Sequence, residues 1–360
     1  MSAPLVVRGA SSSAFAALFP GQLSEKPGMG EALAGRYDFV PSLFEEISRR
    51  SGVRITDTFF GEGAKTLHDD LPAQVGVFSV SLAALETLRR IHHLEPAAVA
   101  GYSLGTYAAF AAAGTLETWA ALDVLLEAER LMSEASRRGE VDGTMAYVIG
   151  LARPAVEDAL AALTSDRARL AIATENAAAQ FILTGDRALV AAAVEALRPK
   201  ALKTDLLSIN TPMHSSSLSA VCDGLQDFLE GKKGRRGVVV KSPAVSLYAP
   251  MLGRRVENAE EAAHVLSKQI CRPSLFAPTL QAMGDSGLTR FAEVGPGDVL
   301  TKMTRWTLRD AKVANPALED PDSIESFAKS LAPPPLFPLK EESTAALASA
   351  RQDLRGSEAK

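Results

Sequence analysis

One serine in this sequence has the surroundings of an enzyme nucleophile. Ser103 is the centre of the segment GYSLG (101–105), which follows a short apolar run and precedes an alanine-rich stretch. This spacing is typical of a nucleophile elbow, a strand–turn–helix whose glycines permit a strained turn that exposes the serine hydroxyl. The N–H of Leu104 would then point towards the reacting carbonyl at a helix N-terminus, where negative charge is favoured. Because a glycine-rich turn with a capping serine has the same pattern, a nucleophilic role also requires a base.

Five histidines are available as that base, and His214 is the best candidate. It lies in SINTPMHSSSL, where a proline ends the incoming strand and the serines suit the start of a helix. A histidine on such a loop is well placed for general base chemistry, although the residues alone leave a structural role equally open. The others are expected to be solvated side chains in polar, acidic or helical surroundings: His68, His92, His93 and His264.

Composition indicates a globular enzyme and disfavours several other classes of protein. The chain has 360 residues, with 38 Lys and Arg against 43 Asp and Glu, so its formal charge of −5 gives no attraction to nucleic acid. Cys222 and Cys271 are far apart and outside any CxxC spacing, so we expect neither a disulfide framework nor a metal site, and a reducing compartment. No apolar run approaches the roughly 18 residues of a membrane span, and Arg8 interrupts the place where an export signal would be apolar. A cytoplasmic protein is expected.

The expected elements divide the chain into an α/β core and an inserted subdomain. Short apolar strands alternate with helical spacing over residues 14–140, and the same pattern resumes over residues 209–312. Between them, residues 141–208 show the β-α-β-β-α-β order of a ferredoxin-like unit. Residues 313–360 contain APPPLFP and an end rich in Ala, Ser and charge, which predicts a partly disordered tail.

Seven segments in fixed order give the chain a resemblance to a known family. From about residue 17 to about residue 306 the chain resembles malonyl-CoA:acyl-carrier-protein transacylases and the related acyltransferase domains of polyketide synthases. The segments that carry the resemblance are LFPGQ (18–22), GYSLG (101–105), GTMAYVIGL (143–151), ENAAAQFILTG (175–185), TPMHSS (211–216), SKQICRPSLF (267–276) and EVGPGDVLTKM (293–303).

The resemblance implies an α/β-hydrolase-like core that carries the ferredoxin-like subdomain and a Ser-His dyad. Ser103 would take the acyl group as an oxyester, and His214 would deprotonate it and later activate an incoming thiol or water. A backbone carbonyl, that of Gln269 by motif alignment, would orient the imidazole in place of a carboxylate. The N–H groups of Gln22 and Leu104 would form the oxyanion hole, where each donor typically contributes about 3–4 kcal/mol to the transition state.

One departure from the family pattern concerns the acyl group. Malonyl-handling members carry an arginine 25 residues after the nucleophile, in a motif resembling RGxLMQEA, and it pairs with the malonyl carboxylate. The matching segment here is AERLMSEA, with Ala128 at the arginine position. Arg130 is turned about 200° away on a helix, and a carboxylate buried without a partner is costly. We therefore expect poor malonyl transfer and an acyl group without a free carboxylate, unless another cation such as Arg272 reaches the pocket.

Other departures lie around the expected pocket. Tyr102 replaces the histidine that is usual beside the serine, and Thr106 replaces the usual Glu or Gln. The loop GQLSEKPGMG, which begins at residue 21, is rebuilt relative to the family; it either reshapes the mouth of the pocket or has drifted neutrally. We expect Ala128, Tyr102 and Met213 to set the acyl specificity.

Three functions remain open on the sequence. The first is an acyltransferase that moves an acyl group from a CoA or carrier-protein thioester to the phosphopantetheine thiol of an acyl carrier protein, in fatty-acid or polyketide biosynthesis, with ping-pong kinetics and without a bound cofactor. The second is an editing hydrolase that passes the same acyl group to water. The third is a silent docking module, which the joint presence of the dyad and its expected partners disfavours. The basic run 231–237 and three residues near the C-terminal end of the core offer sites for an acidic carrier: Lys302, Arg305 and Arg309.

Overall fold

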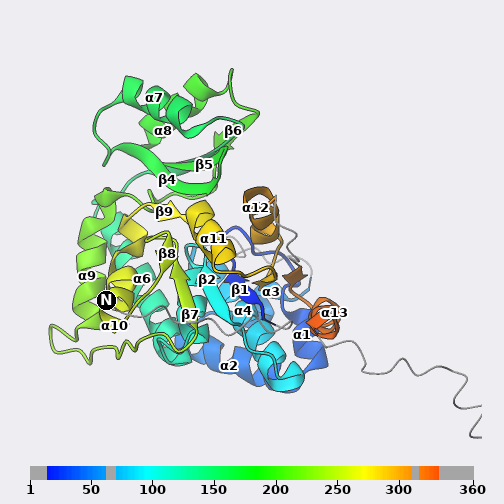
Figure 1. The fold of residues 1–360 in the computed structure, drawn as a ribbon. Helices are drawn as coiled ribbons and strands as arrows, with labels where there is room; N and C mark the ends of the chain where they lie inside the picture. The colour runs from blue at the N-terminus through cyan, green and yellow to red at the C-terminus, as the bar shows by residue number, and fades with distance from the viewer. Residues whose placement is uncertain (1–13, 62–69, 310–315, 332–360) are drawn as a thin grey trace, which may run out of the picture.

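The computed structural model describes residues 14–61, 70–309 and 316–331. These residues form a larger α/β core and a smaller α/β subdomain that covers one end of it (Figure 1). His68 and the segment 332–360 lie outside the described residues.

The core is built on a mainly parallel sheet with β1 near its centre. The strand order is β11-β10-β1-β2-β7-β8, and β1 pairs in parallel with β10 on one side and with β2 on the other. The edge strand β8 runs antiparallel to β7. The strands are β1 (Ala16–Phe19), β2 (Ala98–Gly101), β7 (Ser246–Ala249), β8 (Arg254–Arg255), β10 (Phe291–Val294) and β11 (Ala317–Leu318).

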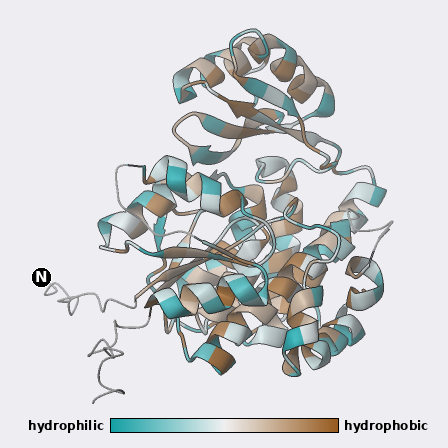
Figure 2. Ribbon diagram, turned by 90° about the vertical axis from the view of Figure 1, so that its right-hand side faces the viewer, coloured by the Kyte–Doolittle hydropathy of each residue, from teal (hydrophilic) through white to brown (hydrophobic). Residues whose placement is uncertain are grey.

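Both faces of this sheet are buried because successive side chains point to opposite sides. Ala17, Phe19 and Val99 pack into the larger apolar cluster with helices of one face. Ala16 and Leu18 pack with α11 and α12 on the other. A parallel sheet covered on both sides needs apolar residues at every position, and Figure 2 shows brown, hydrophobic strands at its centre. The helices of the core are α1 (Glu31–Arg36), α2 (Phe39–Ser51), α3 (Ile55–Phe59), α4 (Asp70–His92), α5 (Gly105–Ala112), α6 (Thr118–Arg137), α9 (Ser219–Leu229), α10 (Ala259–Lys268), α11 (Phe276–Asp285) and α12 (Val299–Thr307).

The 23-residue helix α4 is apolar nearly all round because it runs through the core. One 18-residue window of it is apolar enough to cross a membrane, with a mean hydropathy of 1.4, but 83% of that window is buried in the protein. The expectation that no apolar run approaches the length of a membrane span is therefore wrong. A helix surrounded by other elements needs apolar side chains on every face, which explains the composition.

The smaller subdomain has the element order predicted for residues 141–208. Its antiparallel strands follow the order β6-β3-β5-β4, and β9 (Ser274–Leu275) of the core adds a fifth strand parallel to β4. Two helices cover the outer face of the sheet, so its inner face points towards the core (Figure 1). The elements are β3 (Thr144–Ile149), α7 (Arg153–Leu163), β4 (Leu170–Ala177), β5 (Gln180–Gly185), α8 (Arg187–Leu197) and β6 (Lys203–Leu206).

Part of the predicted tail belongs to the core. β11 pairs with β10, and helix α13 (Pro321–Leu331) packs beside α4 through Phe327, whose ring meets that of Phe15 edge-on at 5.2 Å. The boundary at residue 313 is thus too early. The amphipathic pattern of residues 321–331 buries Ile324, Phe327 and Leu331 against the core, and the proline-rich composition that follows obscured it.

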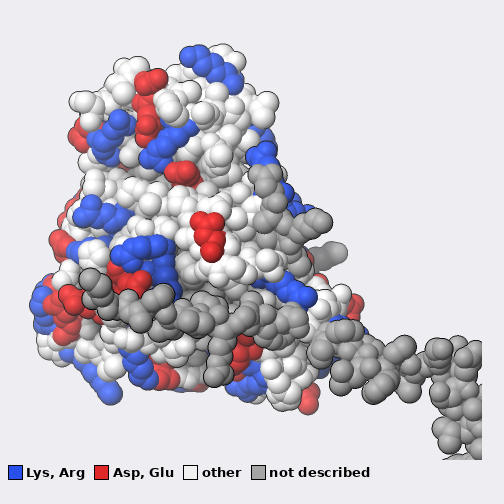
Figure 3. All heavy atoms as spheres, in the orientation of Figure 1, with Lys and Arg blue, Asp and Glu red and all other residues white. Residues whose placement is uncertain are grey.

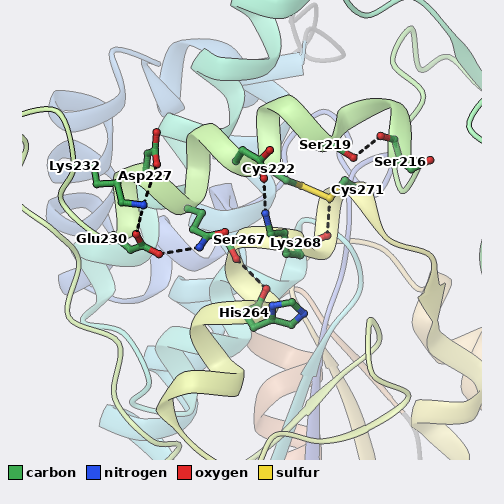
Figure 4. Close-up of polar contacts among 12 residues, drawn as sticks. Ser216, Ser219, Cys222, Asp227, Glu230, Lys232, His264, Ser267, Lys268 and Cys271 are labelled. Atoms are coloured by element: carbon green, nitrogen blue, oxygen red, sulfur yellow. Dashed lines mark hydrogen bonds and ion pairs between the residues drawn. A yellow bond between two sulfur atoms is a disulfide. The ribbon is translucent and has the colours of Figure 1, made fainter.

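The two cysteines are joined, contrary to the sequence-based expectation. Cys222 of α9 and Cys271 of the short 3-10 helix η2 (Gln269–Cys271) form a disulfide with their Cα atoms 6.4 Å apart (Figure 4). Lys268 reinforces the same contact by donating to Asp223 of α9 at 2.6 Å. The chain between them folds back so that residues 49 apart become neighbours. The cysteine pattern consequently gives no argument for a reducing compartment.

Candidate active site

The strand–turn–helix around Ser103 has the geometry of a nucleophile elbow. Ser103 lies in the turn between β2 and α5 with a left-handed φ of 51°. The turn is held by Gly105 N–H donating to Tyr102 O at 2.9 Å and Thr106 N–H donating to Ser103 O at 3.0 Å. Left-handed backbone is uncommon for a residue with a side chain and marks a position where the surrounding structure imposes strain.

Two glycines make this turn possible because backbone passes directly over them. A Cβ atom at Gly101 would lie 2.2 Å from the carbonyl oxygen of Gly105, and one at Gly105 would lie 2.1 Å from that of Phe19. No side chain fits at such distances. The GxSxG spacing therefore reflects the close crossing of α5 over the ends of β1 and β2, which lifts the serine out of the sheet.

The fold brings His214 to this serine across 111 residues of sequence. Ser103 Oγ lies 2.9 Å from His214 Nε2. His214 is 4% exposed and also has a left-handed φ, of 61°, and its N–H donates to Ile270 O at 2.7 Å. The imidazole is thus fixed by its own backbone, in a loop that ends where the 3-10 helix η1 (Ser216–Leu218) begins.

The second ring nitrogen of His214 faces two backbone carbonyls. Nδ1 lies 2.9 Å from Gln269 O and 3.2 Å from Arg272 O. Because both are acceptors, the hydrogen-bond network assigns the proton to Nδ1 and leaves Nε2 free to accept the serine proton. Gln269, 5% exposed, is held in turn by a side-chain hydrogen bond with Tyr107 of α5.

Burial lowers the pKa of His214 below its ordinary value, against the opposing effect of the two carbonyl hydrogen bonds. The neutral, basic form therefore persists to lower pH than for a solvated histidine. We expect the acidic limb of kcat/KM to fall below pH 6.5. Initial rates of acyl transfer between pH 4.5 and 8, with circular dichroism to verify folding, check this; a limb above pH 6.5 would contradict it.

The residues expected to form the oxyanion hole lie beside the nucleophile. Leu104 directly precedes α5, and Gln22 follows β1 in a turn that passes close to the elbow: a Cβ at Gly21 would lie 2.8 Å from Tyr102 O. Gln22 and Ser103 line the same cavity. The side chain of Gln22 is used elsewhere, because its Nε2 donates to Asp70 Oδ1 at 2.9 Å. The N–H groups of both residues remain the predicted donors.

A cavity of about 300 Å³ opens between the core and the inner face of the subdomain sheet, with the dyad in its wall. Its lining is mostly apolar. Tyr102 spans from the elbow to β4, where its hydroxyl donates to Asn176 Oδ1 at 2.9 Å, and its ring meets Phe276 edge-on at 5.0 Å. Subdomain residues Met145, Tyr147, Ile149, Ile182 and Lys203 line one side, and Val299, Leu300 and Met303 of α12 line the other.

A buried carboxylate positions the α12 wall of this cavity. Glu293 at the end of β10 accepts from the N–H groups of Leu300 at 3.1 Å and Thr301 at 2.7 Å. Burial raises the pKa of Glu293, although these two hydrogen bonds stabilise the ionised carboxylate and lower the pKa in part. The carboxylate thereby caps the first turn of α12, and this role was not predicted although the EVGPGDVLTKM segment contains it.

A second cavity of about 180 Å³ lies between α4, α6 and the loop before His214. It shares Gln22, Ile209 and Met213 with the first. Its remaining lining is mostly polar and includes two carboxyl groups, Asp70 and Glu129, which sequence reasoning did not single out. The sequence did contain a signal for Glu129, because it occupies the position of the glycine in the RGxLMQEA-like motif. The other lining residues are Gln74, Met132, Ser133, Ser136, Arg137, Asn210 and Thr211.

Two of the residues expected to set the acyl specificity, Met213 and Ala128, lie differently relative to this second cavity. Met213 is half-buried and lines both cavities. Ala128 is 4% exposed and packs in the core, while Glu129 and Met132 of the same helix line the second cavity. Because residues four apart share a helix face, a long side chain at 128 would reach the side of α6 where Met132 meets the cavity. Arg130 points elsewhere, pairing with Glu127 at 2.7 Å.

The remaining candidate residues line neither of the two cavities. Arg272 is exposed and presents its backbone carbonyl, not its guanidinium, to His214. His92 and His93 lie at the end of α4, and His264 lies on α10. Among residues 14–61, 70–309 and 316–331, no group of three or more His, Cys, Asp or Glu is arranged to hold a metal ion.

The mainly parallel core sheet and the contact between Ser103 and the buried His214 at a strand–helix turn are the arrangement expected of an enzyme that transfers acyl groups through a serine nucleophile. Residues 17–324 match the model of the family described as acyl transferase domain. The chain belongs to this family and is an acyltransferase, as predicted.

Two transacylases are similar in sequence to this chain over most of its length. The chain is 27% identical to the malonyl CoA-acyl carrier protein transacylase of Bacillus subtilis over 321 residues, covering 89% of this chain and 98% of that protein. It is likewise 27% identical to the transacylase of the same name from Staphylococcus aureus, over 85% of this chain and 96% of that one.

Solved structures confirm the predicted fold class. The acyl-carrier-protein S-malonyltransferase of Burkholderia pseudomallei superposes with a TM-score of 0.80 at 27% identity, covering 88% of this chain and 99% of that chain. A malonyl-transacylase solved in complex with its type II polyketide synthase acyl-carrier protein gives a TM-score of 0.81 at 24% identity, over 88% and 99% of the two chains. The latter likeness establishes the shared fold.

Proposed function

We propose that this protein transfers an acyl group from a CoA or carrier-protein thioester, through an ester on Ser103, to the phosphopantetheine thiol of an acyl carrier protein. The observation that supports this most directly is the 2.9 Å contact between Ser103 Oγ and His214 Nε2 in the wall of a mostly apolar cavity. The acyl group proposed is one without a free carboxylate.

The geometry accounts for both half-reactions. Ser103 Oγ attacks the thioester carbonyl while His214 Nε2 takes its proton; the C–S bond breaks, and the imidazolium returns the proton to the departing thiolate. The acceptor thiol then gives its proton to Nε2, its sulfur attacks the ester, and Ser103 leaves with the proton restored. The carbonyls of Gln269 and Arg272 stabilise the transient imidazolium. The N–H groups of Gln22 and Leu104 are the proposed donors to the oxyanion in both steps.

An acyl carrier protein is the proposed partner because the similar transacylases carry it in their names and one fold neighbour was solved with it. The exposed side of α12, which lines the cavity with Met303 and carries Lys302 and Arg305, is the proposed docking face. The basic run 231–237 is less suited, since none of its residues lines the cavity that contains the dyad. Figure 3 shows positive and negative side chains interspersed over the face in view.

The preference for an uncharged or cationic acyl group rests on Ala128 and its surroundings. Burying a malonyl carboxylate without a partner costs several kcal/mol. The alternative is that another cation pairs with a malonyl carboxylate in place of the missing arginine. Among the described residues, Lys203 lines the first cavity and Arg137 lines the second, whereas Arg272 lines neither. Lys203 lies 5.3 Å from the ring centre of Tyr147, on the subdomain side.

An editing hydrolase that passes the acyl group to water is the second candidate, favoured by the same Ala128. It forms an identical ester on Ser103 and differs only in the acceptor. A silent docking module is disfavoured by the dyad contact and the oriented imidazole. The cytoplasm stays the predicted location.

The deciding experiment is intact-protein mass spectrometry after brief incubation with malonyl-, acetyl- and butyryl-CoA, followed over time without an acceptor. A stable adduct from acetyl- or butyryl-CoA supports the proposed transferase. A transient adduct with accumulating free acid supports the hydrolase. A stable malonyl adduct that disappears in Arg137→Gln or Lys203→Gln supports the substitute cation, and no adduct from any donor overturns all three.

A further inference from the structure

The second cavity carries a charge opposite to the one a malonyl pocket needs. Asp70 at the start of α4 and Glu129 on α6 both line it, and Ala128 supplies no positive charge there. We propose that Glu129, together with Asp70, selects an acyl group that bears a protonated amine. This rests on the proposed acyl transfer through Ser103 and names its substrate class.

The cavity is placed to receive the acyl part of a substrate bound at the dyad. Its wall shares Met213, the neighbour of His214, and Gln22, the proposed oxyanion donor, with the cavity that contains Ser103. Gln22 Nε2 donates to Asp70 Oδ1 at 2.9 Å, so one of the carboxylates is anchored to a residue of the reaction centre. An acyl group that extends from Ser103 past Met213 would meet the two acids.

The two carboxyl groups have amide partners in place of cationic ones. Glu129 accepts from Gln74 Nε2 at 2.8 Å, and Asp70 accepts from Gln22. The cation among the described lining residues is Arg137, which is exposed and two turns further along α6. An amide partner adds no positive charge, so each of the two carboxyl groups can pair with a ligand cation when it is ionised.

The protonation behaviour of Glu129 agrees with this assignment. The pKa of Glu129 is raised to about 7, mainly by burial and to a smaller extent by the nearby charge of Asp70. The hydrogen bond from Gln74 has the opposite, smaller effect. An acyl carboxylate would add a third negative charge and raise it further. An ammonium group has the opposite effect, since a nearby cation favours the ionised acid and donates hydrogen bonds to it. Each such charge-assisted bond is typically stronger than a neutral one.

The test compares three acyl groups of similar length on pantetheine: β-alanyl with an ammonium end, butyryl with a methyl end and malonyl with a carboxylate end. Single-turnover acylation of Ser103 is followed by intact-protein mass. β-Alanyl is expected to react about tenfold faster than butyryl, the effect of one charge-assisted hydrogen bond, and malonyl slowest. In Glu129→Gln the β-alanyl to butyryl ratio is expected to fall towards one.

The control is Asp123→Asn, an exposed acid on the same helix that faces neither cavity of the site; it should keep the wild-type ratio. Asp70→Asn provides a second test should Glu129→Gln fold poorly by thermal denaturation. A ratio of one or less in the wild type, or an unchanged ratio in both acid variants, overturns the inference while acylation by butyryl leaves the proposed transferase standing. Failure of every donor to acylate Ser103 would instead overturn the proposed function.

Discussion

Ser103→Ala is expected to form no acyl-enzyme with any thioester donor and to lose transfer to a carrier thiol. The alanine removes the atom that bonds to the acyl group, and residual turnover has to come from binding and oxyanion stabilisation alone. His214→Ala is expected to slow acylation by about 10³-fold or more, because the serine loses the base that lies 2.9 Å from its Oγ. Intact-protein mass and carrier acylation rates measure both effects.

The two losses are expected to overlap when combined. Residues that act as one unit are strongly non-additive, so Ser103→Ala/His214→Ala should be no slower than Ser103→Ala alone. His264→Ala, on α10 and away from the dyad, is the matched control and should retain wild-type rates. An acyl-enzyme that still forms in Ser103→Ala would show that another residue is the nucleophile.

Ala128→Arg is expected to raise malonyl loading at least tenfold relative to acetyl loading. The arginine would extend along the face of α6 that reaches the second cavity at Met132 and would pair with the acyl carboxylate, and a gain of about 1.4 kcal/mol corresponds to a factor of ten. The readout is the ratio of single-turnover acylation rates of Ser103 with malonyl- and acetyl-CoA.

Glu129 is expected to limit this gain, because it would compete with the acyl carboxylate for the new arginine. Ala128→Arg/Glu129→Gly, which reproduces the start of the RGxLMQEA-like motif, should therefore load malonyl faster than the single variant, with a positive coupling in the double-mutant cycle. Ala128→Gln introduces a polar side chain without charge and should give no malonyl gain. A folded Ala128→Arg protein with an unchanged ratio would show that position 128 does not govern the acyl group.

Local patterns in the sequence determined the elements and indicated Ser103 as the candidate nucleophile, whereas the pairing of Ser103 with His214 was implied by the resemblance to the transacylase family. The short apolar runs of β1 and β2, and the β-α-β-β-α-β order of residues 141–208, were readable because each depends on neighbours along the chain. GYSLG indicated the turn, since only glycine fits where α5 crosses the sheet. The predicted nucleophile and base, Ser103 and His214, lie together in the structure.

Only the tertiary structure decided which residues share the site. Nothing in the local pattern places Asp70 of α4 beside Glu129 of α6, or the hydroxyl of Tyr102 on Asn176 of the subdomain. The pairing of Cys222 with Cys271 and the return of α13 to the core likewise depend on contacts between distant segments. Side-chain chemistry and periodicity are properties of the chain, whereas the charge of a pocket is set by how helices from different parts of the chain pack against one another.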